Sequence, residues 1–255
     1  FLIAAPETKD NIHLEVLSRL SALLMDENFR DKLRRAKSPK EFLNYIDEAE
    51  NAKYNEEKTI DVVFLLDRSG SMAGSETDTI GGYNSYLEKQ QQNKIKTLVT
   101  TVLFDNKYEL LNDRKDVNEV NKITNEDYFV RGTTALLDAI GITITNLDKK
   151  IKNKDNKLLF VITTDGLENA STQYNKEQIK ELIEGHKNWE FIYIGANIDS
   201  FKEASSIGIK QKNVANYTKT NIGVNKMFRA INNATECFIE SDKIHTTWKE
   251  ELENN

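Results

Sequence analysis

The stretch VVFLLDRSGSMAGS, residues 62–75, begins with five apolar residues and continues into an acid, three serines and two glycines. The apolar run shows no alternation with polar residues, which indicates a strand that is covered on both faces. Asp67, Ser69 and Ser71 follow at alternate positions, and residues two apart in an extended segment point the same way. We therefore expect a buried strand that brings one carboxylate and two hydroxyls to one point at its carboxyl end.

Apolar strands alternate with helical patterns along the rest of the chain. Strands are predicted at 59–67, 96–106, 107–113, 157–165, 190–197 and 213–218, and helices at 79–92, 133–151, 175–187, 198–206 and 221–241. Alternating β and α units predict an α/β fold with a doubly wound, mostly parallel sheet flanked by helices. Ligands of such sheets bind beyond the carboxyl ends of the strands, where the strand order reverses. Ser75 is expected to cap the helix after the first strand, with Asp78 closing a capping box.

The composition excludes several classes of protein. The 255 residues suffice for one large domain, or for a domain of about 200 residues with an appendage. A net charge of −6 argues against a nucleic-acid partner. No apolar run approaches the ~20 residues of a membrane helix, and no secretory signal is visible. We expect a cytoplasmic protein without nucleic-acid or membrane partners, and nothing in the sequence indicates its oligomeric state.

The supply of ligand residues limits the metals that this chain could bind. Cys237 is the only cysteine, and the three histidines are scattered along the sequence. A cysteine-based zinc site and a histidine-rich metal site are therefore excluded. Any metal must be held by oxygen, which favours Mg²⁺, with Mn²⁺ or Ca²⁺ as alternatives.

Two later segments supply further oxygen ligands. In RGTTALLDAI, residues 131–140, either Thr133 or Thr134 lies at the start of a predicted helix and offers a third hydroxyl. In FVITTDGLENAS, residues 160–171, a second buried strand ends in an acid, Asp165. A buried carboxylate is costly unless a cation or hydrogen-bond donors accompany it. The two hydroxyls and one carboxylate of the first segment would by themselves leave a divalent ion short of negative ligands, which favours an anionic ligand from outside.

These three motifs, D-x-S-x-S, a Thr after G-x, and the Asp of T-D-G, resemble the metal-ion-dependent adhesion site of the von Willebrand factor type A domain. The resemblance covers about residues 59–241, and the text TDTIGGYNSYL and FIYIGANID looks most like intracellular members from bacteria and phages. It implies a metal site made of Asp67, Ser69, Ser71, Thr134 and Asp165. Thr134 is preferred to Thr133 because TALLDAIG matches the run after the family's metal-binding Thr. The resemblance also implies that the hydroxyls hold Mg²⁺ directly or through water, with the acids behind them. The resemblance implies further that an Asp or Glu of a protein partner fills the open position, and we expect that partner to approach near Ser75, Glu168 and Asn169.

Plainer interpretations exist for each motif alone: D-x-S-x-S as a strand-to-turn cap, Asp-Gly as a turn, and Thr as a helix cap. Their occurrence together, in order and on the proper elements, favours the metal site. Enzymatic alternatives fit less well. A phosphotransferase of the haloacid dehalogenase type needs a second Asp where Ser69 stands, a P-loop is absent, and no Ser-His-Asp triad can be assembled. We expect a binding module and not an enzyme.

The first fifty residues differ from the rest. A short strand at 1–6 and helices at 11–26, 26–36 and from 38 are predicted, the last with Ser38 as cap and Glu41 closing a capping box. Residues 1–50 resemble the C-terminal part of a fructose/mannitol-type enzyme IIA of the bacterial sugar phosphotransferase system. The resemblance makes His13 a remnant of its second active-site histidine, or else His13 is an exposed helix residue. A truncated natural fusion, an artificial junction and a segment that packs on another copy all stay open. The alternative function is therefore a phosphotransferase component fused to the binding module, inactive here for lack of a phosphoacceptor histidine.

The predicted organisation has four parts. They are an enzyme IIA-like segment at 1–50, a linker at 51–58, the von Willebrand A-type domain at 59–245 and a C-terminal tail at 246–255.

Overall fold

The structure is a computed structural model that describes the chain except residues 1–11, 55–58, 94, 153–155, 197 and 254–255. For residues 12–16 and 51–54 it describes the backbone alone. The chain divides into two compact units, Phe1–Lys58 and Thr59–Asn255. The strand predicted at 1–6 lies outside the described residues. No helix in the described ranges combines the length and apolar character that a membrane crossing requires.

The described residues of the first unit form three helices, α1 (Ile12–Leu24), α2 (Glu27–Arg34) and α3 (Pro39–Tyr54). Its buried apolar residues among those described are few: Leu23, Phe29 and Leu33. The last helix continues to Tyr54 and thus enters the segment predicted as a linker at 51–58.

Both capping boxes predicted from the sequence are wrong in detail. At α3, Ser38 Oγ accepts the Glu41 N–H at 3.1 Å, but Glu41 Oε2 accepts the N–H of Lys37, one residue before the expected partner. At α4 (Glu76–Gln91), Ser75 makes no side-chain cap hydrogen bond. Its φ of −111° and ψ of 3° are not the extended conformation that directs a capping hydroxyl into the first turn.

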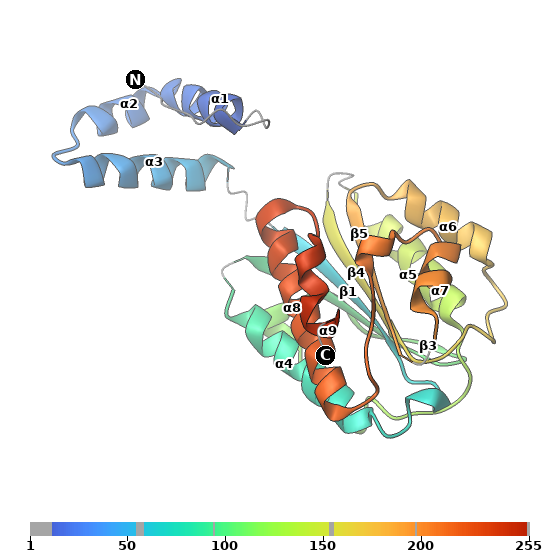
Figure 1. Cartoon of the computed structure of the whole chain (residues 1–255). Helices are drawn as coiled ribbons and strands as arrows, with labels where there is room; N and C mark the ends of the chain where they lie inside the picture. Colours follow the sequence, from blue (N-terminus) through green and yellow to red (C-terminus); the bar gives the residue numbers. More distant parts are fainter. Residues whose placement is uncertain (1–11, 55–58, 94, 153–155, 197, 254–255) are drawn as a thin grey trace. The chain divides into compact units, whose positions relative to one another are not determined.

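The second unit contains a six-stranded sheet in the order β3-β2-β1-β4-β5-β6 (Figure 1). Its strands are β1 (Thr59–Asp67), β2 (Lys96–Phe104), β3 (Tyr108–Asp116), β4 (Lys157–Thr164), β5 (Trp189–Gly195) and β6 (Val214–Asn216). All neighbours are parallel except β2 and β3, which are antiparallel. The chain builds outward from β1 through β2 to β3 and then returns to β4 on the other side of β1. This confirms the predicted doubly wound, mostly parallel sheet, and the strand order reverses between β1 and β4.

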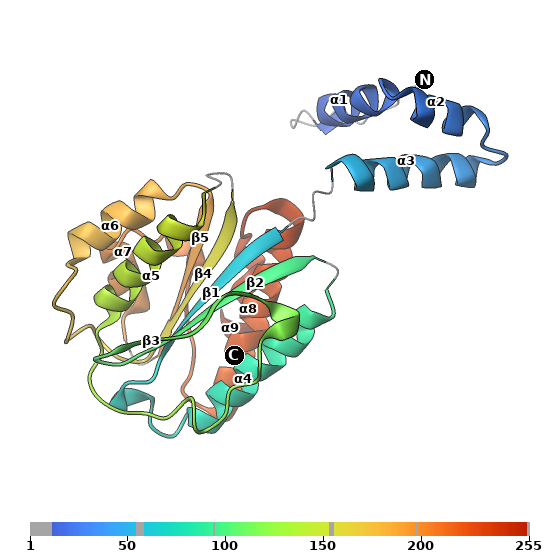
Figure 2. The same cartoon turned by 180° about the vertical axis from the view of Figure 1, so that it is seen from behind.

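Helices cover both faces of this sheet (Figures 1 and 2). One face carries α4, α8 (Asn221–Ser241) and α9 (Glu250–Glu253), and the other carries α5 (Leu136–Lys150), α6 (Lys176–Gly185) and α7 (Ser200–Ser206). Short 3-10 helices lie at Gly70–Met72, Val117–Glu119, Gln211–Asn213 and Thr246–Lys249. Along β1, Phe64 contributes to the core beside α4 and α8, whereas Leu65 contributes to the core beside α5. Because both faces of β1 are buried, its sequence is a nearly continuous apolar run.

The segment predicted as a C-terminal tail, 246–255, packs into this unit up to Glu253. The side chain of Trp248 is fully buried, and its Nε1 donates to Lys212 O at 3.1 Å. Lys249 Nζ donates to Val214 O at 2.9 Å. This end of the chain therefore covers the β6 edge of the sheet.

Candidate metal centre

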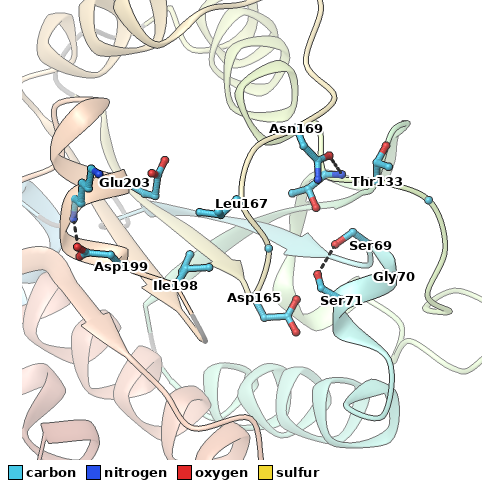
Figure 3. A pocket seen from close by; sticks show the side chains of 14 residues that line it. Ser69, Gly70, Ser71, Thr133, Asp165, Leu167, Asn169, Ile198, Asp199 and Glu203 are labelled. Carbon is cyan, nitrogen blue, oxygen red and sulfur yellow. Dashed lines mark hydrogen bonds between the residues drawn. The ribbon is translucent and has the colours of Figure 1, made fainter.

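The predicted ligands come together at the carboxyl ends of β1 and β4, where the strand order reverses. Asp67 is the last residue of β1, and Asp165 directly follows β4. The register pairs Leu66 with Thr163, so the two strands end side by side. Figure 3 shows Ser69, Ser71 and Asp165 around one cavity at this edge.

In the first loop, which follows β1, the side chain of Asp67 accepts a hydrogen bond from the loop backbone. Asp67 Oδ1 accepts the Ser69 N–H at 2.7 Å, which bends the chain directly after the strand. The Oγ atoms of Ser69 and Ser71 then lie 3.0 Å apart. Ser69 is buried and Ser71 is exposed, so the pair reaches from the interior to the surface. The expected convergence of Asp67, Ser69 and Ser71 is thus present.

The second loop brings Thr134, and not Thr133, to these serines. Gly70 N donates to Gly132 O at 3.1 Å, which ties the two loops together. Gly132 has a φ of +69°, a conformation that favours glycine. Thr134 is buried, whereas Thr133 is exposed on the wall of the same cavity.

In the third loop, which follows β4, Gly166 lies next to the hydroxyls of the other two loops. A Cβ atom placed on Gly166 would lie 2.8 Å from Thr134 Oγ1, 2.9 Å from Ser71 Oγ and 3.6 Å from Ser69 Oγ. Three hydroxyl oxygens therefore surround a volume that only a glycine leaves open. Neutral oxygen donors around a small space suit a hard divalent cation.

Other buried acids of this unit are satisfied by the protein itself. Asp61 pairs with Arg114 at 2.6 Å, and Asp105 pairs with Arg68 at 3.0 Å. The carboxylate of Asp138 accepts three backbone N–H groups of the loop after β4. A buried acid alone is therefore no sign of a metal site in this fold.

The two acids of the candidate centre differ from those three. Asp165 is buried, its Oδ2 lies 2.9 Å from Lys219 Nζ, and its Oδ1 has no hydrogen-bond partner among the described residues. Burial raises the pKa of the Asp67 carboxyl from 3.8 to about 6, against the lowering effect of hydrogen bonds from Thr164 and Ser69, and the charge of Asp165 adds to the rise. Asp67 therefore has a backbone N–H and hydroxyls as partners but no ion pair among the described residues, and Asp165 has a cation on Oδ2 but no partner on Oδ1.

Three residues that hold this centre were not predicted from the sequence. The Thr164 hydroxyl donates to Asp67 Oδ2, the Tyr128 hydroxyl donates to Asp67 O, and Lys219 reaches Asp165 from the loop after β6. Thr164 is adjacent to Asp165 in the sequence, yet only the register of β1 against β4 reveals its contact. Nothing in the sequence indicates the positions of Tyr128 and Lys219.

The three residues expected near a partner differ in their surroundings, and Asn169 lines the cavity. Ser75 is buried, and Glu168 uses its carboxylate on the backbone N–H groups of Leu137, Ala170 and Ser171. The cavity beside the hydroxyls, about 650 Å³ in volume, is lined by residues that also include Leu167, Ile198, Lys202 and Glu203 (Figure 3).

Within the described ranges, no group of three or more His, Cys, Asp or Glu residues gathers in a way that could hold a metal. The candidate centre therefore depends on hydroxyl oxygens. His13 falls in α1, but its side chain lies outside the described residues.

Comparison with protein families matches residues 61–230 to the von Willebrand factor type A domain. It also matches residues 1–49 to the phosphoenolpyruvate-dependent sugar phosphotransferase system, EIIA 2. Comparison with curated proteins gives no match.

Solved structures share the fold of the second unit. The chain is similar to proximal thread matrix protein 1 from the mussel byssus with a zinc-occupied MIDAS motif, at 15% identity and a TM-score of 0.50, over 68% of this chain and 45% of that chain. It is also similar to the ArnB paralog VWA2 from Sulfolobus acidocaldarius, at 18% identity and a TM-score of 0.49, over 69% and 44% of the two chains. The match thus spans less than half the length of the mussel protein and of the Sulfolobus protein. At such identities the likeness to the mussel protein is evidence for the fold alone.

Proposed function

Because the chain belongs to the von Willebrand factor type A family, we propose that its second unit is a metal-dependent protein-binding module and not an enzyme. The observation that carries this proposal is the set of three hydroxyls around Gly166. The unpartnered Oδ1 of the buried Asp165 supports it, since a cation would supply the missing partner.

The hydroxyls of Ser69, Ser71 and Thr134 would hold Mg²⁺, with Mn²⁺ or Ca²⁺ as alternatives, and Asp67 and Asp165 would supply the negative charge behind them. A bound divalent ion supplies a positive charge that accepts a further oxygen ligand. The three hydroxyls are neutral, and Lys219 already offsets part of the charge of Asp165. The centre therefore favours an anionic ligand, and we assign that role to an Asp or Glu side chain of a protein partner that enters the cavity.

The described residues at this site lack groups that the enzymatic alternatives require. Ser69 occupies the position where a phosphotransferase of the haloacid dehalogenase type carries its general acid. Among the described residues that line the cavity there is no histidine or cysteine. These observations favour binding over catalysis.

The neighbouring threonines provide a matched test. Thr134→Ala removes a hydroxyl of the cluster, and Thr133→Ala removes one from the cavity wall outside it. We expect calorimetric titration with Mg²⁺ and with Mn²⁺ to show binding to the wild type and to Thr133→Ala. Thr134→Ala should bind about tenfold more weakly or worse, the effect of losing one ligand worth about 1.4 kcal/mol. Equal affinities of all three proteins would contradict the assignment.

A second candidate function rests on the match of residues 1–49 to the EIIA 2 family. In that case the first unit would belong to a phosphotransferase component that carries the binding module. We propose that the chain as given does not act as a phosphocarrier. Stable phosphohistidine after incubation with phosphorylated phosphocarrier protein would contradict this. The cytoplasmic location and the bacterial or phage origin stay predictions from the sequence.

A further inference from the structure

A lysine from a fourth loop reaches the candidate metal centre. Lys219 belongs to the loop 217–220 between β6 and α8. Its Nζ lies 2.9 Å from Asp165 Oδ2 and also donates to Ser71 O. One ammonium group therefore contacts two of the loops that carry the predicted metal ligands.

This ion pair differs from the surface ion pairs of the unit. The side chain of Asp165 is 1% exposed and that of Lys219 is 22% exposed, so solvent screens the pair only in part. Lys176 and Glu203 also lie 2.9 Å apart, but their side chains are 44% and 22% exposed. Glu203 of this pair lines the cavity, whereas Lys176 is not among the residues that line it.

A lysine at this position changes the charge that a divalent ion would meet. Without Lys219 the centre offers two carboxylates, Asp67 and Asp165. With Lys219 in place, a positive charge already occupies one oxygen of Asp165 and repels a second cation nearby.

We propose that Lys219 is a built-in competitor of the divalent ion. It neutralises Asp165 while the ion is absent and weakens the binding of the ion, so that retention of the metal depends on the carboxylate of a partner. This inference rests on the proposed function, because it takes the hydroxyl cluster as the metal centre. It makes Lys219 a residue that tunes affinity, not a ligand.

Replacement of the lysine tests this directly. Calorimetric titration with Mn²⁺ alone should show that Lys219→Met binds the ion about tenfold more tightly than the wild type, or better, because a nearby like charge is removed. Lys219→Arg keeps the charge and should bind no more tightly than the wild type. Lys176→Met removes an ion pair on the same cavity and should leave the affinity unchanged.

Stability in chelator separates this role from a purely structural one. Both roles predict a lower melting temperature for Lys219→Met without metal, since Asp165 loses its partner. Only the competitor role predicts tighter Mn²⁺ binding at the same time. Lys219→Gln provides a second neutral variant in case the methionine variant does not fold.

The outcomes distinguish the two proposals. Equal or weaker Mn²⁺ binding by the folded neutral variants, with clear binding by the wild type, overturns the competitor role and leaves the metal-dependent module intact. No Mn²⁺ binding by the wild type and by every variant overturns both. Binding by the neutral variants that exceeds that of the wild type supports both.

Discussion

Asn169 and Thr134 hold each other by two hydrogen bonds. Asn169 Oδ1 accepts the Thr134 N–H at 2.9 Å, and Thr134 O accepts the Asn169 N–H at 3.0 Å. The pair joins the loop before α5 to the loop after β4. Both polar groups of the threonine backbone are engaged, and this backbone position places its hydroxyl near those of Ser69 and Ser71.

Asn169→Ala removes the hydrogen bond from Thr134 N–H to the Asn169 side chain without removing a predicted ligand. We expect metal affinity to fall about three- to tenfold and the free energy of unfolding to fall by about 1 kcal/mol, the usual contribution of one hydrogen bond. Titration with Mg²⁺ and urea denaturation measure the two effects. Leu167→Ala, a change at an exposed residue of the same loop, is the control. An unchanged affinity in Asn169→Ala would mean that Thr134 is held well enough without it.

Gly166→Ala places a methyl group in the space between the hydroxyls. Its Cβ would lie 2.8 Å from Thr134 Oγ1 and 2.9 Å from Ser71 Oγ, so one or both side chains must move. We expect metal binding to be lost, while the unfolding free energy in chelator changes by no more than about 1 kcal/mol. Gly185→Ala, where a Cβ meets no atom within 4 Å, should bind metal like the wild type. Retained binding by Gly166→Ala would show that the ion lies elsewhere.

The pH dependence follows from Asp67. Its pKa rises from 3.8 in the unfolded chain to about 6 in the fold, so between these values the folded state holds more protons than the unfolded state. The contribution of this group to the stability of the metal-free protein is fully present below pH 3.8 and is lost as the pH rises through about 6. Metal affinity should instead increase as the pH rises, because the ion needs the ionised carboxylate.

We therefore expect the rise in melting temperature caused by Mg²⁺ to be largest above pH 6 and to vanish toward pH 4. Thermal unfolding with Mg²⁺ and with chelator, from pH 4 to 7.5, measures this difference. Asp67→Asn should remove the decline of metal-free stability through pH 6. A metal effect that stays constant across the range would argue against Asp67 as part of the centre.

The fold was predictable because its strands are covered on both faces. The short apolar runs within 59–67 and 157–165 have the length of buried strands, and their alternation with helices permits few topologies. The caps were less predictable. A serine before a helix reads as an N-cap, but Ser75 adopts a backbone conformation in which its hydroxyl makes no cap hydrogen bond. The last residues read as a polar tail because one aromatic residue, Trp248, gives no periodic pattern.

The candidate site was predictable where it follows single strand ends and unpredictable where it depends on register or distant loops. Asp67, Ser69 and Ser71 lie on one short loop, so their spacing is informative. The contact of Thr164 with Asp67 depends on how β4 aligns with β1. Lys219 is far from Asp165 in the sequence, and no spacing rule connects the two.

Arg68 stands within the D-x-S-x-S motif but has a structural role. Its side chain is fully buried, pairs with Asp105 and Glu109, and lies over the ring of Phe129 at 5.5 Å. Arg131 also pairs with Asp105, at 2.7 Å, but its side chain is 37% exposed. The two arginines therefore share one acid in different surroundings.

Arg68→Met should lower the free energy of unfolding by about 3 kcal/mol, because it leaves part of a buried charge without its partner. Arg131→Met should have a much smaller effect, because solvent replaces the lost partner at an exposed site. Urea denaturation in chelator measures both changes without interference from metal. A loss of metal affinity in Arg68→Met with unchanged stability would instead make Arg68 part of the metal centre. Equal stability losses in the two variants would mean that burial does not decide the strength of this network.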